Sequence, residues 1–96
     1  MGLVQEAISD LEKRKRSIAC GGKDGLLSLL GDLGFQYRRA GDAQHHVFHH
    51  PHLPMDFIHS IDCGHYPKKP MKISYVAKTI RMLRKYQNEL EELYEN

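Results

Sequence analysis

The stretch Gln44-His45-His46-Val47-Phe48-His49-His50-Pro51 places four of the chain's seven histidines in a segment with the pattern of a β-strand. Histidine is the only side chain whose unshifted pKa lets it gain and lose a proton near neutral pH, and it is the commonest metal ligand. Acid/base catalysis and metal binding are therefore the two chemistries to separate. Residues 45, 47 and 49 of an extended strand face one side and residues 46, 48 and 50 the other, so neighbouring histidines cannot all bind one ion.

Two more strands are predicted beside this stretch. Residues 35–39 alternate as a strand, and Gly41 and Asp42 supply the turn of a hairpin with strand 45–50. Pro51 and Pro54 mark a short loop, after which apolar and polar residues alternate again over 55–62. The pattern predicts a sheet of three short strands.

Helices are predicted before and after these strands. Residues 3–11 carry apolar side chains at three-to-four spacing, and Gly21 and Gly22 should end that helix. Asp24 can cap a leucine-rich second helix over 26–33, and Gly34 can end it in the left-handed conformation. Ser74 can cap one long last helix, whose expected buried stripe is Val76, Ile80, Leu83, Tyr86, Leu90 and Leu93. This order predicts an α+β fold, in which helices cover one face of an antiparallel three-stranded sheet and leave the other face open.

The composition limits the kind of site. The 96 residues indicate a single domain with a modest core, so the site should be open rather than enclosed. The net charge is only +2, but residues 63–88 contain no Asp or Glu and several Lys and Arg, a distribution that suits phosphate backbones. Cys20 and Cys63 are too few for a disulfide framework, so we expect free thiols and a reducing compartment. The first twenty residues resemble neither a signal peptide nor a membrane span, and we expect a cytoplasmic protein that is not in a membrane.

Several short motifs, taken in order, resemble the HicA toxins, a family of small bacterial mRNA interferases. They are Leu29-Leu30-x-x-Leu33-Gly34-Phe35, Arg38-Arg39, His45-His46-Val47-Phe48-x-His50-Pro51 and Lys69-Pro70-x-Lys72-x-x-Tyr75-Val76. The resemblance covers residues 23–87, with 1–20 as an amino-terminal helical extension found in one branch of the family and 88–96 as the acidic end of the last helix.

The resemblance implies a fold similar to a double-stranded RNA-binding domain, αβββα, with the extra helix in front. It also implies an endoribonuclease that cleaves mRNA without a metal or other cofactor, and a HicB-type antitoxin as protein partner. His45 falls on the histidine that the family uses in catalysis. The family usually has Gly-Ser before that histidine, whereas this chain has Ala43-Gln44, so an RNA-binding protein of the same fold that has lost cleavage remains an alternative.

Cleavage of RNA without a metal needs a base for the 2′-hydroxyl and a positive group for the charge that develops on the phosphate. His45 is the expected base, and His46, His49 and His50 are all candidates for the acid that protonates the leaving oxygen. The candidate RNA-binding residues are Arg38, Arg39, Lys69, Lys72, Lys78, Arg81 and Lys85. A metal site would draw on His45, His49, His59, His65 or Cys63, but no standard zinc spacing is present.

Overall fold

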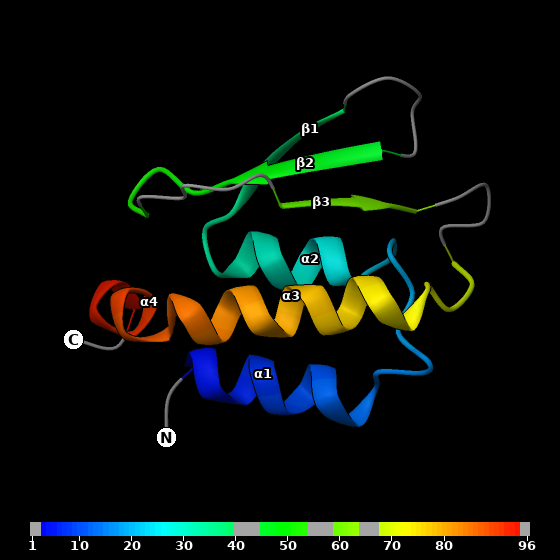
Figure 1. Cartoon of the computed structure of the whole chain (residues 1–96), viewed down its shortest axis with the longest axis horizontal. Helices are drawn as coiled ribbons and strands as arrows, with labels where there is room; N and C mark the ends of the chain where they lie inside the picture. Colours follow the sequence, from blue (N-terminus) through cyan, green and yellow to red (C-terminus); the bar gives the residue numbers. More distant parts are fainter. Residues whose placement is uncertain (1–2, 40–44, 54–58, 64–67, 95–96) are drawn as a thin grey trace.

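The computed structural model describes residues 3–39, 45–53, 59–63 and 68–94, and these form an α+β fold. Three strands make an antiparallel sheet, and the helices lie on one side of it (Figure 1). The elements in order are α1 (Leu3–Lys13), α2 (Leu26–Asp32), β1 (Gln36–Arg39), β2 (His45–His49), β3 (His59–Asp62), α3 (Ile73–Lys85) and α4 (Gln87–Tyr94). The predicted fold class and open sheet are confirmed for the described part of the chain.

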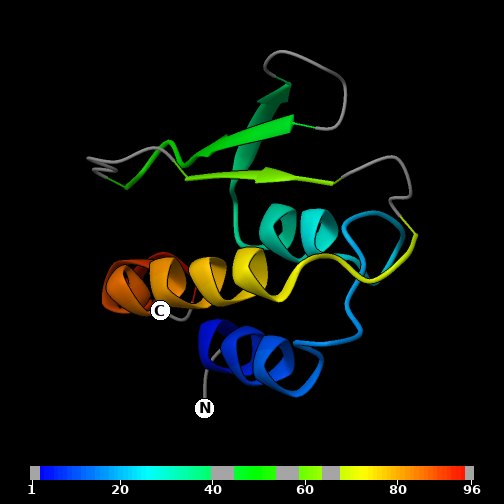
Figure 2. The ribbon, with the colours of Figure 1, turned by 45° about the vertical axis from the view of Figure 1, so that its right-hand side comes forward.

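The sheet has the order β1-β2-β3, so the histidine-rich strand is the central one. Tyr37 pairs with Phe48, which in turn pairs with His59, and this row of side chains faces the helices. The next row on that face is Arg39, His46 and Ile61. Figure 2 shows the helical layer beneath the sheet, and no element of the described residues covers the opposite face. The sheet therefore buries one face and leaves the other open.

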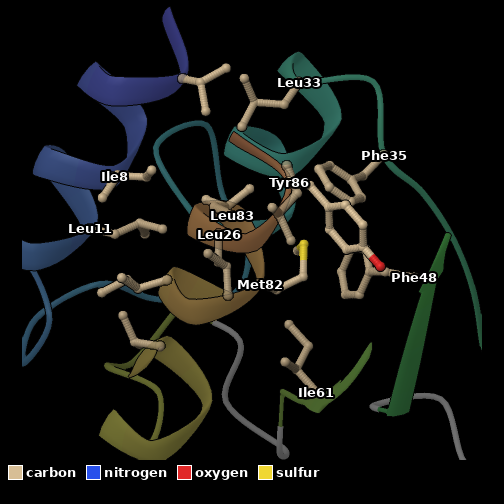
Figure 3. Packing of buried hydrophobic residues seen from close by; sticks show 14 of the residues in the cluster. Ile8, Leu11, Leu26, Leu33, Phe35, Phe48, Ile61, Met82, Leu83 and Tyr86 are labelled. Atoms are coloured by element: carbon tan, nitrogen blue, oxygen red, sulfur yellow. The ribbon is translucent and has the colours of Figure 1, made fainter. Parts of the chain in front are cut away.

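Helix α1 belongs to the core. Its three inward side chains, Val4, Ile8 and Leu11, are buried and pack towards α3 and α4. Figure 3 shows Ile8 and Leu11 pointing into the cluster that also holds Leu83 and Phe48. Burying a side chain of this size stabilises a fold by about 1.5–3 kcal/mol, so α1 contributes substantially to a chain this short.

The leucine-rich helix is also core, but it is not capped as expected. Leu26, Leu30 and Leu33 are buried, and Gly34 has φ of +88°, which confirms the left-handed termination. The prediction that Asp24 caps α2 is wrong, because Gly25 precedes the helix and makes no side-chain cap. The N–H groups at the start of α2 donate instead to Ala19 O (2.9 Å, from Leu26) and Cys20 O (3.0 Å, from Leu27). A folded-back loop thus satisfies donors that side chains more often cap.

The last helix is two helices. Helix α3 begins at Ile73 after Lys72, without a side-chain cap from Ser74, and α4 begins after Tyr86, so both the predicted cap and the single long helix are wrong. The sequence pattern did not reveal the break between α3 and α4, because Leu83, Tyr86 and Leu90 are all buried and keep three-to-four spacing across it. Leu93, expected in the buried stripe, is 42% exposed.

A disulfide joins Cys20 to Cys63, with their Cα atoms 5.6 Å apart, so the expectation of free thiols is wrong. The same region is held by a backbone hydrogen bond from Met71 N to Ile18 O (2.9 Å) and by a bridge between Ala19 and Pro70. These contacts connect the segment before α2, the end of β3 and the entry to α3. Among the described helices, none combines the length and hydropathy needed to cross a bilayer.

Reduction of this disulfide should lower the stability of the fold. The two cysteines are separated by 43 residues, and opening a loop of that size restores chain entropy to the unfolded state worth about 4 kcal/mol. Urea unfolding with and without a thiol reductant measures the difference. A Cys20→Ala/Cys63→Ala variant is the control, because its midpoint should not respond to the reductant. Equal midpoints for oxidised and reduced wild type would contradict the prediction.

Candidate functional site

The pleat of β2 divides the histidine cluster between the two faces of the sheet. His45 and Val47 are half-buried and His49 is exposed on the open face, whereas His46, Phe48 and His50 are buried against the helices. The expected alternation is confirmed. The cluster is therefore two sets of histidines with different surroundings.

The open face around His45 is polar. His45 pairs across the sheet with Asp62, and Arg38 pairs with Val47 on the same face. Opposite residues of an antiparallel pair have Cβ atoms about 5 Å apart, and diagonal neighbours lie about 7–8 Å apart. A basic and an acidic side chain thus lie within reach of a group that contacts His45. Asp62 was not singled out from the sequence, because its pairing with His45 depends on the register of two strands joined by a loop.

His49 shares the open face but is occupied by another contact. Its Nε2 donates to Gln36 Oε1 at 3.0 Å, and Gln36 is its partner in the β1 register. His49 lies four positions along the strand from His45, which corresponds to about 13 Å. One phosphate in contact with His45 is therefore beyond the reach of His49.

His50 is held as a neutral imidazole. Its Nε2 donates to Leu33 O at 3.0 Å, and its Nδ1 accepts from the His52 N–H at 3.1 Å, so both ring nitrogens are used and the tautomer is defined. Its edge also packs on Phe35, with ring centroids 4.9 Å apart. Burial lowers the pKa of His50 below its usual value, although the Leu33 carbonyl partly offsets this effect.

His46 is buried beside the disulfide. Its ring packs edge-on against Tyr37, with centroids 4.9 Å apart, and its Nδ1 lies 3.5 Å from Cys63 Sγ. The structure thus places His46 and His50 on the opposite side of the sheet from His45. Neither can contact a ligand that lies on the open face.

His59, on β3, is fully buried. Thr79 Oγ1 donates to Tyr75 O at 2.9 Å, so His59 Nε2 donates to Thr79 Oγ1 at 3.1 Å and His59 Nδ1 is left without a hydrogen. That Nδ1 has no hydrogen-bond partner. Burial first, and the nearby Lys78 second, lower the pKa of His59 to about 4. The ring is a neutral part of the core.

The seven basic residues proposed for RNA binding do not form one patch. Arg38 is on the open face, whereas Arg39 follows it on the other face of β1, where it pairs with His46. Lys69 and Lys72 are exposed in the segment just before α3. That segment lies at the end of the molecule where β3 ends and β2 begins (Figures 1 and 2).

The other three basic residues lie on α3, on the helical side of the sheet. Lys78 is half-buried and donates to Ser60 O on β3 at 3.2 Å, so it ties α3 to the sheet. Arg81 is exposed, and Lys85 lies over the Tyr86 ring, 5.5 Å from its centroid. Lys85, the last residue of α3, is thirteen positions from Lys72, which corresponds to about 20 Å along the helix.

A metal centre has little support in the described residues. Within the ranges described, no three His, Cys, Asp or Glu side chains are grouped to hold an ion. His45 and His59 lie on opposite faces, and Cys63 is in the disulfide. His65, like Ala43 and Gln44, lies outside the described residues.

In the part of the chain that the structure describes, surface hollows lie over the helices. Two hollows, of about 160 and 320 Å³, are lined by residues of α1 and of the α2 region, with Asp10 common to both. His45 belongs to the central strand and lies on the open face of the sheet. Comparisons of the chain with protein-family models, with curated proteins and with solved structures gave no match.

The buried His59 should make the fold sensitive to acid. Its pKa is about 4 in the folded chain and about 6.5 when unfolded, so between these values the unfolded state binds more protons and stability falls as the pH falls. The contribution is intact above pH 6.5, and about 3 kcal/mol is lost by pH 4. Urea unfolding of wild type and His59→Gln across this range tests the window.

The variant should show a shallower loss of stability on the acid side than wild type. His49→Gln, which changes an exposed histidine, is the matched control and should follow the wild-type profile. Parallel profiles for wild type and His59→Gln would show that His59 does not cause the acid sensitivity.

Proposed function

We propose that this chain is a metal-independent endoribonuclease of the HicA toxin type, with His45 as the general base. The observation that carries the proposal is the position of His45 on the open face, with Arg38 diagonally beside it. Support also comes from the sequence motifs around His45 and from the order of three strands between helices, which is the order expected of a double-stranded RNA-binding-domain-like fold.

An open sheet face suits a substrate that is itself long. A nucleic-acid strand lies across a surface and is held mainly through its phosphates, so a deep cavity is not required. Arg38 provides a charged group beside His45, and the segment before α3, where Lys69 and Lys72 are exposed, lies at the same end of the molecule. Arg39 lies on the other face of the sheet and is left out of the proposed interface. Arg81 and Lys85 lie on α3, away from this face, and are left out of the proposed interface.

The proposed reaction is an internal transfer of the phosphodiester. Neutral His45 takes the proton of a ribose 2′-hydroxyl, the 2′-oxygen attacks the adjacent phosphorus, and the bond from phosphorus to the 5′-oxygen breaks. Arg38 stabilises the negative charge on the phosphoryl oxygens. Since His46 and His50 are buried and His49 is remote, solvent on the open face supplies the proton to the 5′-oxygen.

Asp62 has a different role from Arg38 in the proposed reaction. A carboxylate opposite an imidazole can orient the ring and favour the imidazolium that forms when the base has taken its proton. The same carboxylate repels phosphate, so the RNA backbone should approach from the Arg38 side of His45.

A HicB-type antitoxin remains the proposed protein partner. Because the site lies on the open face of the sheet, a partner that covers His45 and Arg38 would exclude RNA without any change in the toxin's fold. This part of the proposal depends on the family resemblance.

Substitution His45→Ala should reduce RNA cleavage by about 10²–10⁴-fold, because a positioned general base contributes that much to the rate. Cleavage of a long RNA in EDTA measures it, with circular dichroism as a check on folding. His49→Ala removes a histidine from the same face and should cleave at nearly the wild-type rate.

A folded His45→Ala protein that cleaves as fast as wild type would rule out His45 as the base. If neither protein cleaves, the alternative of an RNA-binding protein without cleavage takes over. Its signature is RNA binding that weakens as salt is added.

Substitution Arg38→Gln should weaken RNA binding and reduce its salt dependence. Loss of one phosphate contact makes the slope of log affinity against log salt shallower by about 0.7 for single-stranded RNA. Binding is measured in the His45→Ala background so that the RNA stays intact. Arg81→Gln, with the same change of charge on α3, should leave the slope unchanged, and equal effects of the two substitutions would contradict an interface on the open face.

A further inference from the structure

The disulfide lies next to the proposed site in the chain and in space. Cys63 directly follows Asp62, which pairs with His45. Its partner Cys20 comes from the segment before α2, which is hydrogen-bonded to the entry of α3 through Ile18 O and Met71 N. The disulfide therefore links the end of β3 covalently to the helical layer. Asp62, the residue opposite His45, is at that end of β3.

The two sulfurs differ in their surroundings. Cys20 is 1% exposed and belongs to the hydrophobic core, whereas Cys63 is half-buried at the end of an edge strand. Cys63 is also the sulfur beside an imidazole, because His46 Nδ1 lies 3.5 Å from it. A reagent from solvent should therefore react at Cys63, and in the reduced protein His46 is placed to accept the proton of the Cys63 thiol.

We propose that Cys63, with His46 and Cys20, is a thiol–disulfide exchange site that takes low-molecular-weight thiols and disulfides, and that it switches the neighbouring His45 site. Cys63 is the sulfur that reacts with the small molecule. Cys20 is the sulfur that resolves the mixed disulfide, and His46 is a positioning residue that favours the Cys63 thiolate.

A small disulfide oxidises the reduced protein in two steps. In the reduced protein, the Cys63 thiolate, having given its proton to His46, attacks a small disulfide RSSR, so a Cys63–SR bond forms and one RS⁻ leaves. Cys20 then loses its proton and attacks the Cys63 sulfur, which closes the Cys20–Cys63 bond and expels the second RS⁻. The two protein thiols are oxidised, one RSSR is reduced to two RSH, and the two protein protons end on the products. The reverse reaction consumes two small thiols, the first attacking at Cys63.

The effect on the His45 site rests on the proposed function. With the bond closed, the end of β3 is covalently fixed and Asp62 is held opposite His45. With the bond open, that end is held by non-covalent contacts alone, and small displacements at a reacting centre lower rates strongly. The oxidised form is therefore the more active one.

The exchange is tested with oxidised glutathione as the probe and mass spectrometry as the readout, which requires no RNA cleavage. Reduced wild type should form the Cys20–Cys63 bond. The Cys20→Ser variant should keep one glutathione on Cys63, and the Cys63→Ser variant should react at Cys20 at least about tenfold more slowly because that thiol is buried.

The role of His46 is tested in the Cys20→Ser background. His46→Phe keeps a ring against Tyr37 but cannot accept a proton, so the reaction of Cys63 with glutathione disulfide at pH 7 should slow by about tenfold. His50→Phe, which changes another buried histidine of the same strand face, is the matched control and should react like its parent. Circular dichroism checks that each variant is folded.

Wild type that retains two thiols in excess oxidised glutathione, or equal reaction rates for the two single-cysteine variants, would overturn the exchange site. The switch is tested separately by RNA cleavage with oxidised and reduced wild type, where reduction should lower the rate by about tenfold or more. Equal rates would overturn the switch. No cleavage in either state would count against the proposed function, while the mass measurements would still decide the exchange site.

Discussion

The pleat of the central strand is the constraint on which the rest of the structure depends. Phe48 must face the helices to join the core with Ile61 and Leu83, and this direction sends His46 and His50 inward and His45 and His49 outward. A slip of one residue in the register would expose Phe48 and bury His45, so hydrophobic burial fixes the exposure of the proposed base. Which side chains the open face presents is thus determined by an apolar contact on the opposite face.

Three histidines on or near the central strand are buried, namely His46, His50 and His59. Burial of these rings requires specific partners. His50 uses both ring nitrogens, and His59 uses one through Thr79 while its other nitrogen has no hydrogen-bond partner. A neutral imidazole is far less costly to bury than an imidazolium, and the lowered pKa values of His50 and His59 express that difference. These histidines help to define the packing of the sheet on its helices. Although they are near His45 in the sequence, they do not share a site with it.

One end of the molecule brings together segments that are distant in the chain. The loop before α2 satisfies the first N–H groups of that helix, pairs with the entry to α3 and is bonded through Cys20 to the end of β3. His45 begins β2 and Asp62 ends β3, and these two strand ends lie at this same end of the sheet (Figure 1). The framework around the proposed site is therefore built by elements from across the chain, including α1, which packs beneath α3.

Local patterns in the sequence determined the elements. Apolar spacing identified α1 and the leucine-rich α2, Gly34 marked the end of α2, and alternation identified the strands and placed His45 and His46 on opposite faces. These features depend on residues within a few positions of one another, where helix and strand periodicity act.

Tertiary structure alone decided which distant groups became partners. Lys78, which the sequence placed among the basic residues, donates to Ser60 O, Cys63 was expected to be a thiol and is bonded to Cys20, and α2 is capped by the Ala19 and Cys20 carbonyls in place of Asp24. The turn at Tyr86 was equally hidden, because burial continued through it with helical spacing. Each outcome depends on surfaces that exist only when separate segments have packed, since burial makes polar groups find partners wherever the fold brings them within reach.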